Sequence, residues 1–137
     1  MTRLTLKEDW PEVKGPVVMY IQATIAGGYP HRVTIEDDNG RTLVDKCESP
    51  GVSSEDFGKQ FLNYKHKVDS RDEHIFNVTI EHNPDNKGWC ESSYKVSDSL
   101  NIADSAIFGI VLSNDGGGDL DYNDCVVIIS LYQQSFD

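Results

Sequence analysis

The segment DGGGDLDYNDCVVII, residues 115–129, decides the fold and suggests the function of this chain. Its first ten residues contain four aspartates, one asparagine and three consecutive glycines, and its last five form an apolar run typical of a buried strand. Carboxylates about 4 Å apart repel each other by ~1 kcal/mol in water and by ~4 kcal/mol at an effective dielectric of 20. The segment therefore predicts a cation site at the start of a strand.

The oxygen donors of this segment favour calcium. Ca²⁺ takes six to eight oxygen ligands in a flexible shell, whereas Zn²⁺ prefers nitrogen and sulfur. An EF-hand loop is excluded, because Asp124 stands where that loop needs a glycine and Ser130 where it needs a bidentate glutamate. Four carboxylates would neutralise two divalent ions, so two calcium ions per chain are expected. A solvated acidic turn without a ligand is the alternative.

The segments FGIVLS (108–113) and DYNDCVVII (121–129), with the acidic loop between them, resemble the C-terminal signature of the LecB-type bacterial lectins. That family binds fucose and mannose through calcium. The resemblance implies a β-sandwich in which the acidic loop holds two adjacent calcium ions and sugar hydroxyls coordinate both ions directly.

The chain departs from this family at two places. The family's loop is one residue shorter, and its calcium-binding glutamate is replaced here by Asn114 followed by Asp115, either of which could substitute. The family chain also ends sooner, in a glycine whose carboxylate reaches the neighbouring subunit, whereas this chain continues through residues 133–137. The resemblance implies a homo-oligomer, most simply a dimer, but the extension puts that subunit contact in question.

The segment 26–29 aligns with the family segment that supplies a backbone carbonyl to calcium and sets the sugar preference. Gly27 and Gly28 lack the hydroxyl side chains that some members use to favour fucose, so the resemblance implies a mannose-type preference. The candidate metal ligands are Ala26, Asn114, Asp115, Asp119, Asp121, Asn123 and Asp124. The candidate sugar contacts are Gly27, Gly28, Tyr29, Asp119, Asp121 and Asp124.

Composition narrows the class of protein. A chain of 137 residues is expected to form a single domain, 1–137. Its net charge of −11 disfavours nucleic acid and anionic membranes as partners, because phosphate binding needs a basic face. No window is apolar over eighteen residues, so no membrane insertion is expected. The first ten residues lack a signal-peptide core, which predicts cytoplasmic synthesis, with release or surface display by a non-classical route as the alternative.

Short apolar or alternating segments predict an all-β fold, an antiparallel β-sandwich of about eight or nine short strands. A turn at 38–40 predicts a hairpin between 32–36 and 41–45, and residues 97–106 are expected to be a connector. The other expected strands are 17–25, 60–68, 74–80, 89–96, 108–112 and 126–131. The four histidines are expected at the surface or in loops, and the three cysteines as idle thiols, with a Cys47–Cys90 bridge as the alternative.

These patterns favour a binding protein over an enzyme. The leading hypothesis is a calcium-dependent lectin for mannose- or fucose-containing glycans. The alternative is a structural or adhesive module in which calcium only stabilises the fold. A hydrolase is disfavoured, since acids this dense are better explained by metal ligation than by an acid and base pair.

Overall fold

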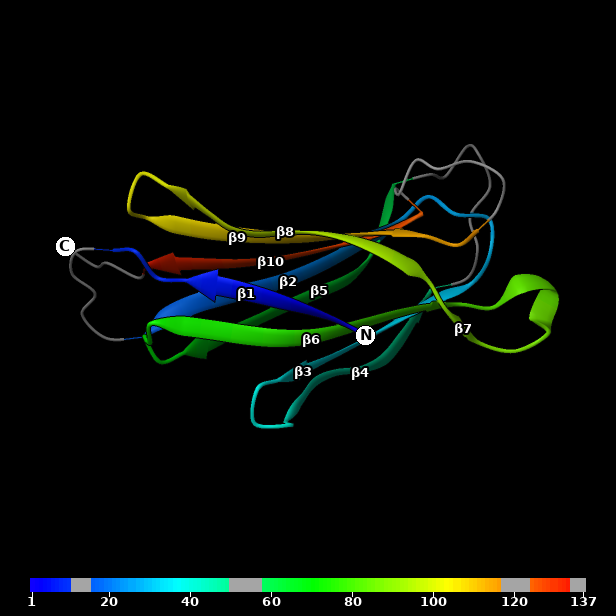
Figure 1. The fold of residues 1–137 in the computed structure, drawn as a ribbon, viewed down its shortest axis with the longest axis horizontal. Coiled ribbons are helices and arrows are strands. Elements are labelled where there is room, and N and C mark those ends of the chain that lie inside the picture. The colour runs from blue at the N-terminus through cyan, green and yellow to red at the C-terminus, as the bar shows by residue number, and fades with distance from the viewer. Residues whose placement is uncertain (11–15, 50–57, 117–123, 134–137) are drawn as a thin grey trace.

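A computed structural model describes residues 1–10, 16–49, 58–116 and 124–133, which form two antiparallel sheets. One sheet has the order β1-β6-β3-β4, with β7 paired to β6, and the other has the order β5-β2-β10-β9-β8. Figure 1 shows the two layers. The strands are β1 (Thr2–Lys7), β2 (Val17–Ile25), β3 (His31–Asp37), β4 (Thr42–Ser49), β5 (Lys59–Val68), β6 (Glu73–His82), β7 (Cys90–Glu91), β8 (Ser93–Ile102), β9 (Ala106–Asn114) and β10 (Cys125–Gln133).

The antiparallel sandwich confirms the predicted fold class. The described residues contain ten strands rather than eight or nine, and one short 3-10 helix, η1 (Pro84–Asn86). In the described part of the chain, no helix is long and apolar enough to cross a membrane.

Strand β2 shows how the alternating pattern builds the core. Along its nine residues every odd-numbered side chain is buried and every even-numbered one is partly exposed. Since successive side chains of a strand point to opposite faces, one face packs inward and the other faces outward. Strands β3 and β6 alternate in the same way, and the side chains of Val33, Ile35, Val78 and Ile80 are fully buried.

Strand β1 was not expected and closes one side of the sandwich. Its Leu4 and Leu6 are fully buried. Both leucines lie against Gly109 of β9, where an added Cβ would come within 2.7 Å of Leu4 and 2.6 Å of Leu6. On the other side, β4 and β5 are the terminal strands of their sheets and do not pair with each other. Among the described residues, the two sheets are therefore not joined by strand pairing on this side.

The expectation that residues 97–106 form a connector is largely wrong. Strand β8 continues to Ile102, and its pairing with β9 shifts register between Ser97 and Leu100. Ser99 has a φ of 49° at this irregularity. Since β8 is a terminal strand with Leu100 and Ile102 more than 45% exposed, its sequence lacks a clear apolar alternation.

The strand expected at 89–96 is divided between the two sheets. β7 pairs with β6, whereas β8 pairs with β9. All three cysteines carry free thiols, so the alternative of a Cys47–Cys90 bridge is wrong in this structure. Burial raises the pKa of Cys125 to about 12, which leaves that thiol protonated and unreactive at neutral pH.

Candidate functional site

Four strand termini meet at one end of the sandwich. β9 ends at Asn114, β10 begins at Cys125, β2 ends at Ile25 and β3 begins at His31. Cys125 pairs with Ser113 on one side and with Ile25 on the other. The register therefore brings the described ends of the acidic segment beside the segment 26–29.

Asp124 joins these segments. Its backbone N–H donates to the carbonyl of Ser113 at 3.2 Å, and its own carbonyl accepts from the N–H groups of Ala26 at 2.9 Å and Gly27 at 3.0 Å. Its carboxylate accepts from the N–H of Asp115 at 2.9 Å. The residue is only 8% exposed, so its carboxylate is held in a fixed, largely buried position.

Asp115, which directly follows β9, also lies beside Gly27. Its side chain is 6% exposed, and its Oδ2 lies 3.8 Å from Nε2 of His31. A Cβ added to Gly27 would lie 2.9 Å from this oxygen and 3.1 Å from Cβ of Asp124. Both acidic side chains thus pack against the bare backbone of Gly27, and any larger residue would displace them. Gly28 has open space around it instead.

Asn114 has a different local role. Its Oδ1 accepts from the N–H of Gly116 at 2.7 Å, which is the side-chain turn that asparagine commonly forms with the residue two positions later. Gly116 has a φ of 80°, a conformation that glycine adopts without strain. Asn114 therefore stabilises the exit of the chain from β9, while the following Asp115 faces Gly27.

His31 was expected at the surface or in a loop but is fully buried. The Tyr29 carbonyl can only accept, so Nδ1 of His31 donates to it at 2.7 Å. Nε2 has no hydrogen-bond partner among the described residues. Burial is the main cause that lowers the pKa of His31, and the Tyr29 bond and the Asp115 charge oppose it.

A neutral His31 consequently turns a lone pair toward the Asp115 carboxylate. This electron-rich arrangement fits a nearby cation. The alternation of β3 could have predicted the buried position, because His31 shares its face with Val33 and Ile35.

Tyr29 also lies at this end. Its half-buried ring stacks on His82, with ring centroids 6.2 Å apart and an interplanar angle of 22°. His82 is itself held by a 2.9 Å hydrogen bond between Nδ1 and the Ser92 hydroxyl. The aromatic side chain predicted as a sugar contact is thus fixed beside His31.

The candidates Asp119, Asp121 and Asn123 lie outside the described residues. Among the residues that are described, no three His, Cys, Asp or Glu side chains group around a common point. The described part of the candidate site offers two carboxylates, one amide oxygen and backbone carbonyls. These are the hard oxygen donors that calcium prefers.

The chain is similar to known proteins. The family model for fucose-binding lectin II (PA-IIL) matches residues 15–133. No curated protein sequence matches the chain.

Three solved lectin structures share the fold, each with a TM-score of 0.62. The Chromobacterium violaceum lectin CV2L, in complex with alpha-methyl-fucoside, is 19% identical over 95% of this chain and 96% of its own. The C-terminal domain of the Burkholderia cenocepacia lectin BC2L-C is 18% identical over 94% and 95%. The Ralstonia solanacearum high-affinity mannose-binding lectin is 15% identical over 92% and 93%.

The family match spans most of the chain and confirms the resemblance inferred from residues 108–129. It also confirms the expectation of a carbohydrate-binding protein rather than an enzyme. The chain belongs to the fucose-binding lectin II (PA-IIL) family.

Proposed function

We propose that the chain is a calcium-dependent lectin in which the acidic segment 114–124 holds two calcium ions that bind mannose- or fucose-type sugars. The observation that carries this proposal is the convergence of Asp115 and Asp124 on the backbone of Gly27, at the end of a lectin fold. One related structure contains alpha-methyl-fucoside and another is described as a mannose-binding lectin, which supports these two sugar classes.

The proposed calcium ligands come from both sides of the site. Asp124 and Asp115 supply carboxylates, and Ala26, held against Asp124 by its N–H at 2.9 Å, supplies a backbone carbonyl. We assign Asp115 as the substitute for the family's glutamate, because its carboxylate lies beside Gly27 while the Asn114 amide is engaged with Gly116. Asp119, Asp121 and Asn123 complete the proposed set.

Bound calcium would supply the coordination positions that neighbouring sugar hydroxyls can take from water. The protein's part is to hold its oxygen ligands in place and to leave room for the sugar. The hydrogen bond between Asp115 and Asp124 fixes two of these ligands relative to each other. The open space at Gly28 leaves room for a ring, and the Tyr29 side chain, stacked on His82, is a candidate wall.

We propose a mannose-type preference from the same segment. The hydroxyl side chain that would favour fucose is missing at both glycines. Only Gly28 has the space to carry such a side chain, because a Cβ on Gly27 would collide with His31 and Asp115. Gly28 is therefore the position from which sugar preference can be set in this chain.

We further propose that the chain forms a dimer through the outer face of the β5-β2-β10-β9-β8 sheet. On β9 and β10 the outward side chains are mostly apolar and only partly covered. The Tyr132 ring packs edge-on against Tyr20 at 5.5 Å and against Phe108 at 5.8 Å. An apolar face of this kind is typical of a protein interface. Its central members are Tyr20, Phe108, Ile110, Leu112, Val126, Ile128 and Tyr132.

Isothermal titration calorimetry with methyl mannoside, methyl fucoside and methyl galactoside, in excess calcium and in EDTA, tests the function. We expect calcium-dependent binding of mannoside, weaker binding of fucoside and no binding of galactoside. Calcium uptake without binding of any of the three at millimolar concentration would instead favour a module that calcium only stabilises. Sugar binding that persists in EDTA would contradict the role of calcium.

A further inference from the structure

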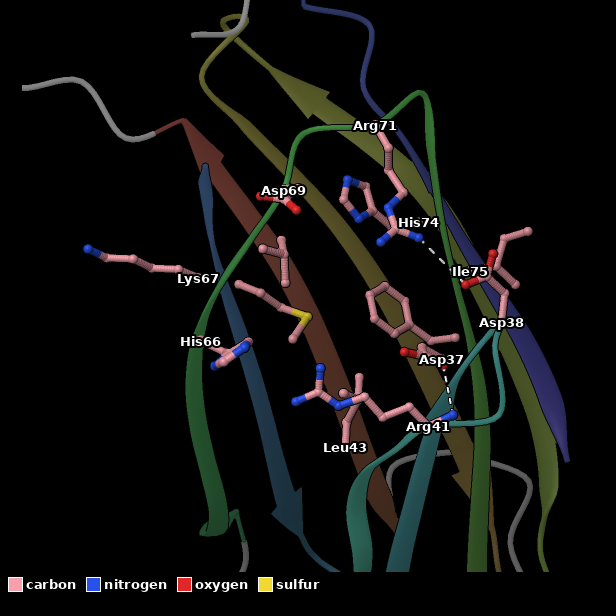
Figure 2. A pocket seen from close by; sticks show the side chains of 13 residues that line it. Asp37, Asp38, Arg41, Leu43, His66, Lys67, Asp69, Arg71, His74 and Ile75 are labelled. Atoms are coloured by element: carbon pink, nitrogen blue, oxygen red, sulfur yellow. Dashed lines mark hydrogen bonds and ion pairs between the residues drawn. The ribbon is translucent and has the colours of Figure 1, made fainter. Parts of the chain in front are cut away.

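A pocket lies at the end of the sandwich opposite the candidate calcium site. Its volume is about 260 Å³, and it opens between the terminal strand β5 and the turn that joins β3 to β4 (Figure 2). Strand β2 passes both places: Met19 lines the pocket and Ala26 lies at the candidate calcium site, seven residues away. At about 3.3 Å per residue this separation is roughly 23 Å, so one monosaccharide cannot span both sites.

The floor of this pocket is apolar and comes from both sheets. Met19 of β2 is 1% exposed and Phe76 of β6 is 4% exposed, and the half-buried Leu43 and Val68 flank them. Met19 and Phe76 are almost fully covered, so the apolar surface that the pocket offers comes from Leu43 and Val68. A volume just below the ~300–1,000 Å³ of drug-sized pockets suits one sugar ring.

Some of the charged side chains that line the pocket already have hydrogen-bond or ion-pair partners. Asp37 Oδ1 accepts from the backbone N–H groups of Asn39 at 3.0 Å and Arg41 at 2.9 Å, which closes the turn. Asp38 forms an ion pair with Arg71 at 3.6 Å. These contacts shape the pocket, but they involve the backbone of Arg41 and not its guanidinium.

Four other polar side chains line the pocket, those of Arg41, His66, Lys67 and Asp69. No described residue forms a side-chain hydrogen bond or an ion pair with any of them. Figure 2 shows the Arg41 side chain extending from the turn toward His66 of β5. A guanidinium that forms no ion pair with a described residue can still accept an anion, because it presents a planar set of N–H donors.

His74 adds a hydrogen-bond acceptor. Its Nε2 contacts the Glu8 carboxylate, which also accepts from the Ser70 hydroxyl at 2.6 Å and from the Arg71 N–H at 2.8 Å. Since a carboxylate with these donors is an acceptor, Nε2 carries the proton, and Nδ1 of the neutral ring is left to accept. Burial, the main cause, lowers the pKa of His74, which keeps the ring neutral at pH 7.

We propose that this pocket binds a monosaccharide-sized sugar acid, with its carboxylate on Arg41, its hydroxyl groups on His74 and Asp69, and its apolar ring face on Leu43 and Val68. A carboxylate fits better than phosphate or sulfate. Asp37, Asp38 and Asp69 line the same pocket and would repel a more highly charged anion. The site would be a second carbohydrate site that does not depend on calcium.

The test is an NMR titration of the calcium-loaded, ¹⁵N-labelled protein with methyl glucuronide, and with methyl glucoside as the analogue that lacks the carboxylate. We expect glucuronide to shift the amide signals of Arg41, His66 and Phe76 and to bind at least about tenfold more tightly than glucoside, as a charge-assisted contact predicts. Arg41→Gln should weaken glucuronide binding at least about tenfold. Arg3→Gln, the same change on the exposed part of β1, should leave it unchanged.

Three results would overturn the proposal. These are an absence of shifts in the pocket at millimolar glucuronide, shifts confined to Gly27 and Tyr29, and equal binding of acetate or inorganic phosphate, which would mark a general anion site. A parallel titration with methyl mannoside reports on the calcium-mediated site through Gly27 and Tyr29. Failure of one site is therefore distinguished from failure of the other.

Discussion

The backbone N–H of Asp115 donates a 2.9 Å hydrogen bond to the carboxylate of Asp124, across the segment that separates β9 from β10. Both side chains also lie against Gly27. The geometry that brings two negative charges together is thus built from backbone contacts. Removing one charge should change cation binding more than it changes the fold.

Asp124→Asn tests whether the charge at this position governs calcium binding more than it governs the fold. The asparagine Oδ1 can still accept from Asp115, but the lost charge should weaken calcium binding at least about tenfold, given attractions of ~4 kcal/mol per charge pair at an effective dielectric of 20. Calcium titration calorimetry measures the effect, and Asp121→Asn should act in the same way. Asp104→Asn, at an exposed residue far from the site, is the matched control. Unchanged affinity and two bound ions in Asp124→Asn would argue against a shared pair of ions.

Removal of calcium should lower thermal stability. A ligand that binds only the folded state adds RT ln(1 + [L]/Kd), about 2.7 kcal/mol at a hundredfold excess over Kd. For a domain of this size that corresponds to roughly 5–15 °C in Tm. Differential scanning calorimetry with calcium and with EDTA measures the shift, and magnesium at the same concentration is the control. An unmoved transition together with no calcium uptake would exclude the proposed cofactor.

The two glycines of the segment 26–29 should respond differently to substitution. Gly28→Ser has open space and should shift the relative affinity from mannoside toward fucoside. Gly27→Ser would place its Cβ 2.9 Å from Asp115 Oδ2 and should weaken calcium binding instead. Calorimetry with both methyl glycosides and with calcium separates the two effects. A Gly27→Ser variant with normal calcium affinity would show that Asp115 is not held against Gly27 in the working site.

The outer face of the β5-β2-β10-β9-β8 sheet should govern association. Ile128→Lys places a charge in the centre of this face and should convert a dimer to a monomer, because burying an unpaired ammonium is unfavourable. Thr34→Lys, on the outer face of the other sheet, is the matched control. Light scattering coupled to size-exclusion chromatography gives the mass of each. A monomeric native chain would refute the proposed interface.

The parts of the fold that could be predicted are those with a strong apolar pattern. The strand predicted at 17–25 has the bounds of β2, and the run 126–131 lies within β10. Strand β1 and residues 97–102 were missed because they run at sheet edges, where one or both faces meet water and the alternation weakens. Their place depends on contacts such as Leu6 against Gly109, which local sequence does not encode.

The candidate site was likewise predicted only in part. The resemblance to the lectin family implied that Asp115, Asp124 and the segment 26–29 belong to one site, although 26–29 lies far from the acidic residues in the sequence. The burial of His31 could have been predicted from the alternation of β3, but its place beside Asp115 depends on how the two sheets pack together. The sequence suggested that either Asn114 or Asp115 could replace a glutamate, and only the observed contacts favour Asp115.

The buried pair of Glu8 and His74 should make stability depend on pH. Burial lowers the folded-state pKa of His74 from its ordinary value of 6.5, so below that pH the unfolded chain binds a proton that the folded chain does not. The contribution of His74 is therefore full above about pH 6.5 and declines as the pH falls through the folded-state pKa. Urea denaturation at pH 7 and pH 5 should show a smaller loss in His74→Gln, whose amide N–H can still donate to Glu8, than in the native chain. His66→Gln, at an exposed histidine, should keep the native difference, and an equal loss in all three proteins would assign the pH dependence to other groups.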